Sequence, residues 1–331
     1  MIDTLKIFTL DYNIREDNKL TFRVDENRET GEILQKQFYN SDDFNVTVNN
    51  KGLFIQFSLP RLSGEETNFY PVDLSCYKMV LRTLESIFNY LGILTSLDTF
   101  RISRMDLFKN IEIKYPFLDY SLILNSLNLK RTLKRDYGNT FTMLNSLREV
   151  CFYDKNLETL NKYHKVLFDF NVMRGEVRFK THQENKKRGF DRVDELPDKK
   201  DLLKKSYQDF MKMIFNRECN NNNEEIKNEL LIYSLIREKG FRKAIEFLGV
   251  KEFRGLQKEK LREVLLEQYS RMGAYKMLKI LDERERELDK YLKEDKFNIL
   301  YNEIKDKFLS EEIWNEDKGV KRWVINKVKR R

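Results

Sequence analysis

The chain has 331 residues, with 62 lysines and arginines against 54 aspartates and glutamates, which gives a formal net charge of +8. Hydrophobic residues make up 40% and aromatic residues 13% of the sequence, a composition that excludes disorder over most of the chain. No stretch approaches the ~20 apolar residues of a membrane helix, and the charges at Asp3 and Lys6 come too early for a signal peptide. We therefore expect a mildly basic cytoplasmic protein that does not enter a membrane.

Cysteine and histidine usage limits the kinds of site that the chain can build. The three cysteines, Cys76, Cys151 and Cys219, are odd in number and far apart, which predicts neither a disulfide framework nor a zinc site. The sequence contains two histidines, His164 and His182. A metal site built from several histidines is therefore not expected.

Alternation of apolar and polar residues, with many β-branched and aromatic side chains, predicts strands in the first part of the chain. The expected strands are Ile2–Leu10, Leu20–Val24, Ile33–Tyr39, Asn45–Val48 and Leu53–Leu59. The last two are expected to form a hairpin around Asn49–Gly52, because asparagine and glycine tolerate the positive φ angles of a tight turn.

Helices and strands are both expected in the middle of the chain. Apolar residues at three- and four-residue spacing predict a helix over about Tyr77–Leu94, and Pro116–Leu129 is expected to be a helix that begins at its proline. The other elements expected here are strands at Phe100–Ile113, Glu149–Tyr153 and Asn171–Thr181, and a helix at Leu157–Val166.

Helical patterns dominate from Asp198 onward. The expected helices are Leu202–Phe215, Ile226–Lys239, Arg242–Leu248, Lys258–Met272, Ala274–Leu292 and a last one that begins at Ser310. Breaks near Gly240 and Gly249 are compatible with a helix-turn-helix or with a plain helical bundle. We predict an α+β fold, with an antiparallel-sheet domain and flanking helices at residues 1–197, followed by a mostly helical, basic domain at residues 198–331.

The end of the chain concentrates positive charge. It carries no acidic residue after Asp317, and its basic residues are Lys318, Lys321, Arg322, Lys327, Lys329, Arg330 and Arg331. Smaller basic groups occur at Lys130–Arg135 and Lys186–Arg188. Such clusters either contact the phosphate backbone of a nucleic acid, with binding that depends strongly on salt, or form a solvated charged surface.

Four strand-like segments each place an acidic residue or a tyrosine among apolar neighbours. They are centred on Asp3, Asp106, Tyr153 and Glu176. A charge in the middle of a strand is costly to bury unless it is paired or binds a metal. Each acid could instead face solvent, or form an ion pair with Arg104, Arg174 or Arg178.

The order of these motifs resembles the replication initiators of filamentous phages, of the gene II protein type, and of rolling-circle plasmids whose tyrosine lies in a Y-[DE]-K-x-x-E context. The segments that carry the resemblance are Met1-Ile2-Asp3-Thr4-Leu5, Phe69-Tyr70-Pro71, Ser103-Arg104-Met105-Asp106, Tyr153-Asp154-Lys155 with Glu158, and Arg174-Gly175-Glu176. The resemblance covers about residues 1–190 and extends more loosely into the helical part. The sequence lacks the His-hydrophobic-His motif of many tyrosine nickases, so carboxylates would have to supply the metal site.

The resemblance implies a metal-dependent DNA endonuclease and strand transferase that initiates rolling-circle replication. In this family a tyrosine attacks single-stranded DNA at the origin, forms a 5′-phosphotyrosyl link and leaves a 3′-OH for a polymerase. The implied partners are a single-stranded nick site, a duplex origin, and a helicase and polymerase of a host bacterial cytoplasm. An origin-binding protein of the same descent without nicking activity is the alternative. A general nucleic-acid-binding protein would explain the basic tail but not the acids.

The resemblance also assigns roles to residues. Tyr153 would be the nucleophile, and because the pKa of tyrosine is near 10 it would need activation, for which a divalent cation is suited. The candidate ligands for Mg²⁺ or Mn²⁺, which prefer hard oxygen donors, are Asp3, Asp106, Glu176 and Asp154.

The roles of several neighbours stay open at this point. Asp154 and Glu158 could instead serve as a base or a helix cap, and Lys155 could hold the scissile phosphate or be a solvated lysine. His182 shares a face with Glu176 only if their strand extends that far, whereas His164 is expected at a helix end. The residues assigned to DNA contact are Arg104, Arg174 and the seven basic residues of the tail.

Overall fold

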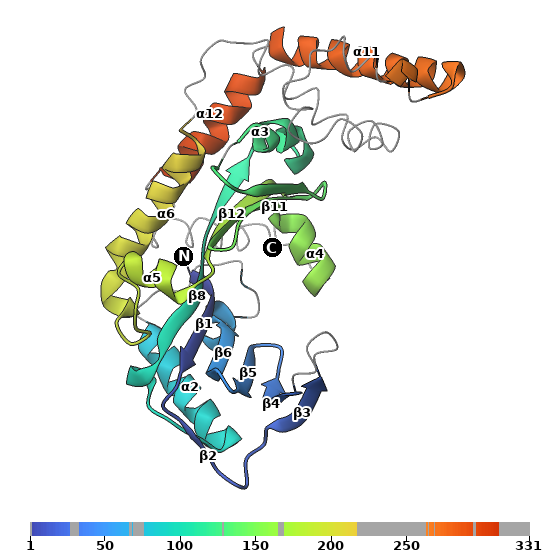
Figure 1. The fold of residues 1–331 in the computed structure, drawn as a ribbon. Helices are drawn as coiled ribbons and strands as arrows, with labels where there is room; N and C mark the ends of the chain where they lie inside the picture. The colour runs from blue at the N-terminus through green and yellow to red at the C-terminus, as the bar shows by residue number, and fades with distance from the viewer. Residues whose placement is uncertain are drawn as a thin grey trace.

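A ten-stranded antiparallel sheet forms the centre of the computed structural model (Figure 1). The structure describes residues 2–26, 33–65, 68, 76–127, 129–164, 169–216, 263, 265–267, 269–293 and 296–310. In order across the sheet, the strands are β3 (Thr21–Glu26), β4 (Ile33–Asn40), β5 (Phe44–Asn49), β6 (Gly52–Ser58), β1 (Ile2–Thr9), β8 (Arg101–Ile113), β12 (Asn171–Phe179), β11 (Arg148–Asp154), β10 (Thr140–Leu144) and β9 (Leu133–Asp136). The first strand of the chain therefore lies beside β8, near the middle of the sheet.

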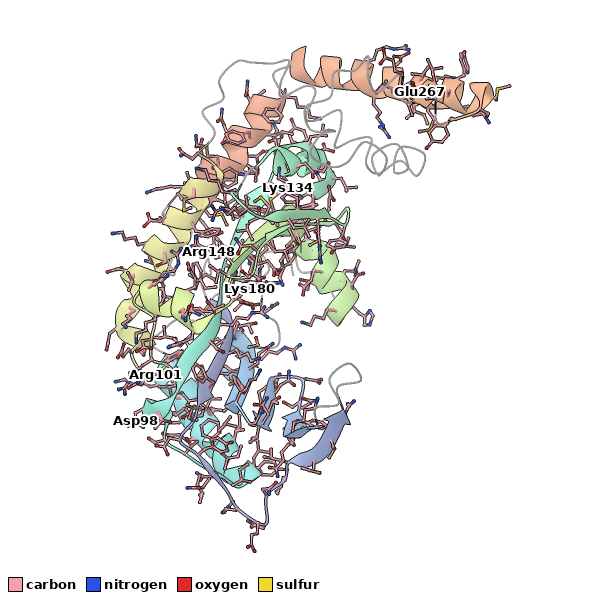
Figure 2. All side chains as sticks on the ribbon, in the orientation of Figure 1. Asp98, Arg101, Lys134, Arg148, Lys180 and Glu267 are labelled. Atoms are coloured by element: carbon pink, nitrogen blue, oxygen red, sulfur yellow. The ribbon has the colours of Figure 1, made fainter. Side chains whose placement is uncertain are left out.

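Helices flank this sheet, and side chains project from both of its faces (Figure 2). The α-helices are α1 (Leu59–Leu62), α2 (Tyr77–Leu91), α3 (Ser121–Ser126), α4 (Lys155–Tyr163), α5 (His182–Lys187), α6 (Lys200–Ile214), α11 (Arg271–Lys293) and α12 (Lys296–Leu309). Short 3₁₀ turns are η2 (Leu97–Thr99), η3 (Phe117–Tyr120) and η4 (Leu196–Lys199), and β2 (Asn13–Ile14) pairs with β7 (Ile93–Leu94). None of the helices in the described parts of the chain combines the length and apolar composition needed to cross a bilayer.

One face of the sheet is apolar and carries the hydrophobic core. Leu5 and Ile7 on β1 alternate with partly exposed residues, as expected for a strand with one buried face. At Gly175 on β12, Phe308 of α12 and Met211 of α6 approach so closely that an added Cβ would lie 2.6 Å from the Phe308 ring. The absence of a side chain at Gly175 is thus what lets both helices pack on the sheet.

The helices α6 and α12 belong to the segment predicted as a second domain, and both complete the core of the sheet. The Tyr207 hydroxyl of α6 donates to the Gly175 carbonyl at 3.0 Å, and the Lys109 Nζ of β8 donates to the Ser310 carbonyl at 2.6 Å. Tyr301 of α12 packs against the same buried cluster. A separate domain therefore stays a prediction for the residues outside the described ranges.

The sequence-based prediction of a mixed fold with a large antiparallel sheet and flanking helices is confirmed. The structure adds the strands β9 and β10 and the helix α12, which the sequence patterns did not predict, and it splits the expected helix Pro116–Leu129 into η3 and α3. The expected helices at Ile226–Lys239 and Arg242–Leu248, the possible helix-turn-helix, and the helix from Ser310 lie outside the described residues.

The close packing at Gly175 yields a prediction for stability. Gly175→Ala should lower the free energy of unfolding by about 1–3 kcal/mol, because the methyl group overpacks against Phe308. Chemical denaturation measures this change. Adding Phe308→Leu to Gly175→Ala should recover part of the loss, and Gly273→Ala, where the nearest atom is 3.4 Å away, serves as control. Unchanged stability of Gly175→Ala would contradict this packing.

Candidate functional site

The opposite face of β8, β12 and β11 carries charged and polar side chains. Directly opposite residues on antiparallel strands share a face. The register places Asp106 on β8 opposite Arg178 on β12, and Arg174 on β12 opposite Tyr153 on β11. Since alternate residues share a face, Glu176 lies between Arg174 and Arg178 on this same side. These polar residues thus face away from the side on which α6 and α12 pack.

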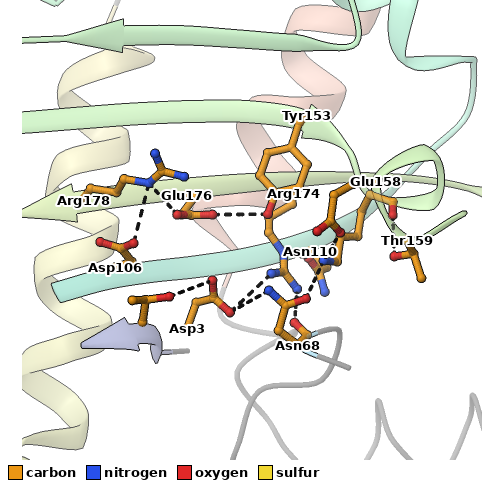
Figure 3. A network of polar contacts seen from close by, with 12 residues as sticks. Asp3, Asn68, Asp106, Asn110, Tyr153, Glu158, Thr159, Arg174, Glu176 and Arg178 are labelled. Atoms are coloured by element: carbon orange, nitrogen blue, oxygen red, sulfur yellow. Dashed lines mark hydrogen bonds and ion pairs between the residues drawn. The ribbon is translucent and has the colours of Figure 1, made fainter. Parts of the chain in front are cut away.

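A chain of contacts links two carboxylates to Tyr153 (Figure 3). Arg104 donates from Nε and Nη2 to both carboxylate oxygens of Asp106, at 2.8 and 2.6 Å. The Nε of Arg178 lies 2.6 Å from Glu176 Oε1 and 3.7 Å from Asp106 Oδ2. The Tyr153 hydroxyl donates to Glu176 Oε2 at 3.2 Å. Glu176 is therefore fixed by an arginine on one oxygen and contacts the phenol with the other.

A fully buried arginine lies beside this chain. Arg174 donates from Nε to Asn110 Oδ1 at 2.7 Å, and its guanidinium lies 3.9 Å from the centroid of the Phe108 ring. Its Nη1 is 3.8 Å from Asp3 Oδ1. The positive charge of Arg174 is thus held against the sheet between Asp3 and Tyr153, which lies opposite it on β11.

A buried lysine completes the group of polar residues. Lys155, the first residue of α4, has no exposed surface, and its Nζ donates to Asn68 Oδ1 at 2.8 Å and to Glu158 Oε2 at 2.5 Å. Asn68 in turn donates to Asp3 Oδ1 at 2.9 Å. The alternative of a solvated Lys155 is therefore wrong.

Burial shifts the pKa values of three of these groups. Loss of hydration raises the pKa of Tyr153 well above its usual 10, although the nearby Arg174 charge opposes the shift. Burial lowers the pKa of Lys155 to about 8, and repulsion from Arg174 adds to the effect. Burial raises the pKa of Asp106 to about 7, against the hydrogen bonds from Arg104. Tyr153 is therefore a neutral phenol that needs a base, and Lys155 is poised to exchange a proton near neutral pH.

Of the eight sequence-predicted site residues that the structure describes, seven converge here. The polar cluster contains seven of them: Asp3, Arg104, Asp106, Tyr153, Lys155, Arg174 and Glu176. Arg104 is partly exposed, whereas Arg174, also assigned to DNA contact, is fully buried and binds protein groups instead. The tail from Lys318 to Arg331 lies outside the described residues.

Other candidates lie elsewhere. Asp154 Oδ1 accepts a hydrogen bond from the backbone N–H of Leu157 at 3.0 Å, so the carboxylate caps α4, one of the roles left open by the sequence. The strand β12 ends at Phe179, so it does not extend as far as His182. His182 is instead the first residue of α5, and its Nε2 lies 3.4 Å from Asp191 Oδ1. His164 ends α4 with a φ of 52°, as a helix-end residue.

The structure adds residues that sequence reasoning missed. Asn68 links Lys155 to Asp3, and Asn110 holds Arg174. Asn110 lies four residues after Asp106 on the predicted strand, so its even spacing could have identified it. Asn68 directly precedes the Phe69-Tyr70-Pro71 segment, but nothing in its local sequence indicates a contact with Lys155.

A metal ion would have to compete with the arginines of this cluster. The described parts of the chain contain no group of three or more Asp, Glu, His or Cys side chains arranged to hold a metal ion. Asp106 and Glu176 nevertheless both present hard oxygen donors to the same nitrogen, the Nε of Arg178. Two carboxylates that already share one positive group have the donor chemistry that Mg²⁺ or Mn²⁺ needs.

The sequence matches no family model and no curated protein. The chemistry of the polar cluster therefore carries the functional argument.

The raised pKa of Asp106 predicts how stability depends on pH. Between pH about 4 and 7 the folded state retains a proton that the unfolded state loses, so the free energy of unfolding should fall as pH rises and level off above pH about 7. The fall is at most about 4 kcal/mol, at about 1.4 kcal/mol per pKa unit. Asp106→Asn should show no such fall when its free energy of unfolding is measured by chemical denaturation at several pH values across this range. If the free energy of unfolding fell equally with pH in the wild type and in Asp106→Asn, the raised pKa of Asp106 would be contradicted.

Proposed function

We propose that this protein is a DNA strand-transfer enzyme that nicks an origin through Tyr153 and initiates rolling-circle replication. The observation that carries the proposal is the hydrogen bond from the Tyr153 hydroxyl to Glu176, with Lys155 and Arg174 nearby. A phenol, a fixed carboxylate and two buried positive groups are what nucleophilic attack on a phosphodiester requires. The resemblance to phage and plasmid initiators supports the same assignment.

The proposed reaction exchanges one phosphodiester for another. Glu176 accepts the phenolic proton while the Tyr153 oxygen attacks phosphorus, and the bond from phosphorus to the 3′-oxygen breaks. Lys155, whose pKa is lowered to about 8, is suited to bind the phosphate and to protonate the leaving 3′-oxygen. Attack by a 3′-OH on the phosphotyrosine reverses the reaction and reseals the strand.

Mg²⁺ or Mn²⁺ is the proposed cofactor, with Asp106, Glu176 and Asp3 as its candidate ligands. A bound divalent cation would polarise the phosphate and neutralise its charge. Arg178 holds Asp106 and Glu176 in this structure, and Arg174 lies next to Asp3. The basic tail at Lys318–Arg331 is the proposed contact with duplex origin DNA, and a host polymerase would extend the freed 3′-OH.

Tyr153→Phe should abolish formation of the covalent adduct, because it removes the nucleophile. The substrate is a pool of random-sequence single-stranded DNA labelled at the 3′ end, incubated with Mn²⁺. A 5′-phosphotyrosyl link keeps the 3′ label on the wild-type protein in a denaturing gel, whereas a 5′ label is released. The stability cost should be only about 1 kcal/mol, that of one hydrogen bond.

Tyr137→Phe is the matched control, since this exposed tyrosine lies in the turn between β9 and β10. It should form the adduct at the wild-type level. Adduct formation by Tyr153→Phe, or a wild-type protein that binds the DNA without any adduct, would refute the proposal. The second result would instead support an origin-binding protein without nicking activity.

Asp106→Asn should weaken Mn²⁺ binding at least about tenfold, as measured by electron paramagnetic resonance of the free ion, and should slow nicking. Asp194→Asn is the control, because Arg192 binds Asp194 at 3.0 and 2.8 Å in the same two-point geometry, two residues apart, as Arg104 binds Asp106. Equal Mn²⁺ affinity for wild type and Asp106→Asn would show that Asp106 acts only as the ion-pair partner of Arg104 and Arg178.

A further inference from the structure

Aromatic side chains cross the sheet on its outer face, beyond the polar cluster. The register places Phe38 on β4 opposite Thr47 on β5, Thr47 opposite Phe54 on β6, and Phe54 opposite Phe8 on β1. The Phe8 and Phe54 rings are stacked, with centroids 5.9 Å apart and planes 21° apart. The next position in this row is Arg101 on β8. These residues therefore form one continuous row across five strands.

The two stacked rings remain partly exposed on the face that does not carry the core. Leu53 and Ile55, the neighbours of Phe54 along β6, are fully buried, whereas Phe54 itself is only partly buried. Phe8 alternates with the buried Ile7 in the same way. The His182 ring packs edge-to-face against Phe8, with the two ring centroids 5.4 Å apart. The usual residue on the outer face of such a sheet is polar, so the partly exposed pair of stacked phenylalanines is a candidate surface for a ligand with an aromatic face.

A row of amide and basic side chains lies next to the rings. Lys6, two residues before Phe8, lies opposite Gln56 on β6 and opposite Arg104 on β8. The Lys6 Nζ is 5.3 Å from the centroid of the Phe54 ring. Arg104 binds Asp106, so this row joins the aromatic pair to the polar cluster by a continuous series of side chains.

We propose that the outer face formed by Phe8, Phe54, Lys6 and Gln56 binds the single-stranded DNA that flanks the nicked phosphodiester. Bases stack on Phe54 and Phe8, and Lys6 contacts the backbone phosphates. Every base has an aromatic face, so this binding tolerates any sequence. The inference rests on the proposed function for the identity of the strand, and it assigns this surface a role apart from the chemistry at Tyr153.

The surface fits a single strand better than a duplex or a protein. In a duplex the faces of the bases are already stacked on one another, so the rings of Phe8 and Phe54 could not reach them. A protein partner would bury a larger apolar patch with few lysines at its centre. Here the two rings lie beside Lys6 and Gln56, the combination of aromatic and basic groups that binds single strands.

Binding is measured without cleavage, by fluorescence anisotropy of a labelled oligothymidylate of about 20 nucleotides with full-length Tyr153→Phe protein. Adding Phe54→Leu should weaken binding about tenfold, because one base loses its stacking partner. Tyr90→Leu is the matched control, since Lys19 Nζ lies 3.6 Å from the centroid of this exposed ring on α2. It should bind within about twofold of the parent protein.

Lys6→Gln provides a test that keeps both rings. It should reduce the slope of log affinity against log salt by about 0.7, the value of one phosphate contact on a single strand, whereas Lys19→Gln should not. Affinities of Phe54→Leu within about twofold of the parent, with an unchanged slope for Lys6→Gln, would overturn the inference. The proposed function would survive that result if wild-type protein still forms the adduct. If Phe54→Leu weakens binding but the wild-type protein forms no adduct, the DNA-binding role of this surface would be supported and the nicking activity refuted.

Discussion

The shared contact of Arg178 with Asp106 and Glu176 is the interaction on which the polar cluster depends. Both carboxylates are buried, and a buried charge without a partner is far more costly than one that is paired. One guanidinium group between them offsets their mutual repulsion and fixes the position of Glu176. Because Glu176 accepts the hydrogen bond of Tyr153, the orientation of the phenol follows from this ion pair.

The antiparallel sheet makes that contact possible. Asp106 and Arg178 lie opposite each other on β8 and β12, and a shift of one residue in this register would move every charge to the face where α12 packs. Gly175, between Arg174 and Glu176, lets Phe308 approach that other face closely. The same three-residue segment thus serves the core with its glycine and the polar cluster with its two charges.

The proposed reaction needs positive charge beside the phosphate, and two buried basic residues lie next to Tyr153. Arg174 and Lys155 are both buried beside Asp3, which lies in the first strand of the chain. Burial, together with repulsion from Arg174, lowers the pKa of Lys155 to about 8, so the lysine can lose its proton near pH 8 while the arginine keeps its charge. In the proposed reaction, Lys155 is then available for proton transfer and Arg174 for permanent neutralisation of charge.

The strands and most candidate residues could be predicted from sequence, because alternation with period two identifies β8 and β12 and places Asp106 and Glu176 within them. The strand on the other side of β8 could not be predicted, since the pairing of β8 with β12 joins residues that are far apart in the chain. The burial of Lys155 was also missed, because it depends on Asn68 from a distant segment. The strands β9 and β10 were missed because they are short, and β9 overlaps the Lys130–Arg135 segment, which was noted only for its basic residues.

We propose that Tyr153 is the residue that becomes joined to DNA. The most direct measurement is tandem mass spectrometry of wild-type protein after reaction with a random single-stranded DNA pool and Mn²⁺, followed by nuclease trimming and proteolysis. We expect a nucleotide 5′-phosphate on the peptide that contains Tyr153, with fragment ions that place it on the phenolic oxygen. A nucleotide on another tyrosine, or no modified peptide at all, would contradict it.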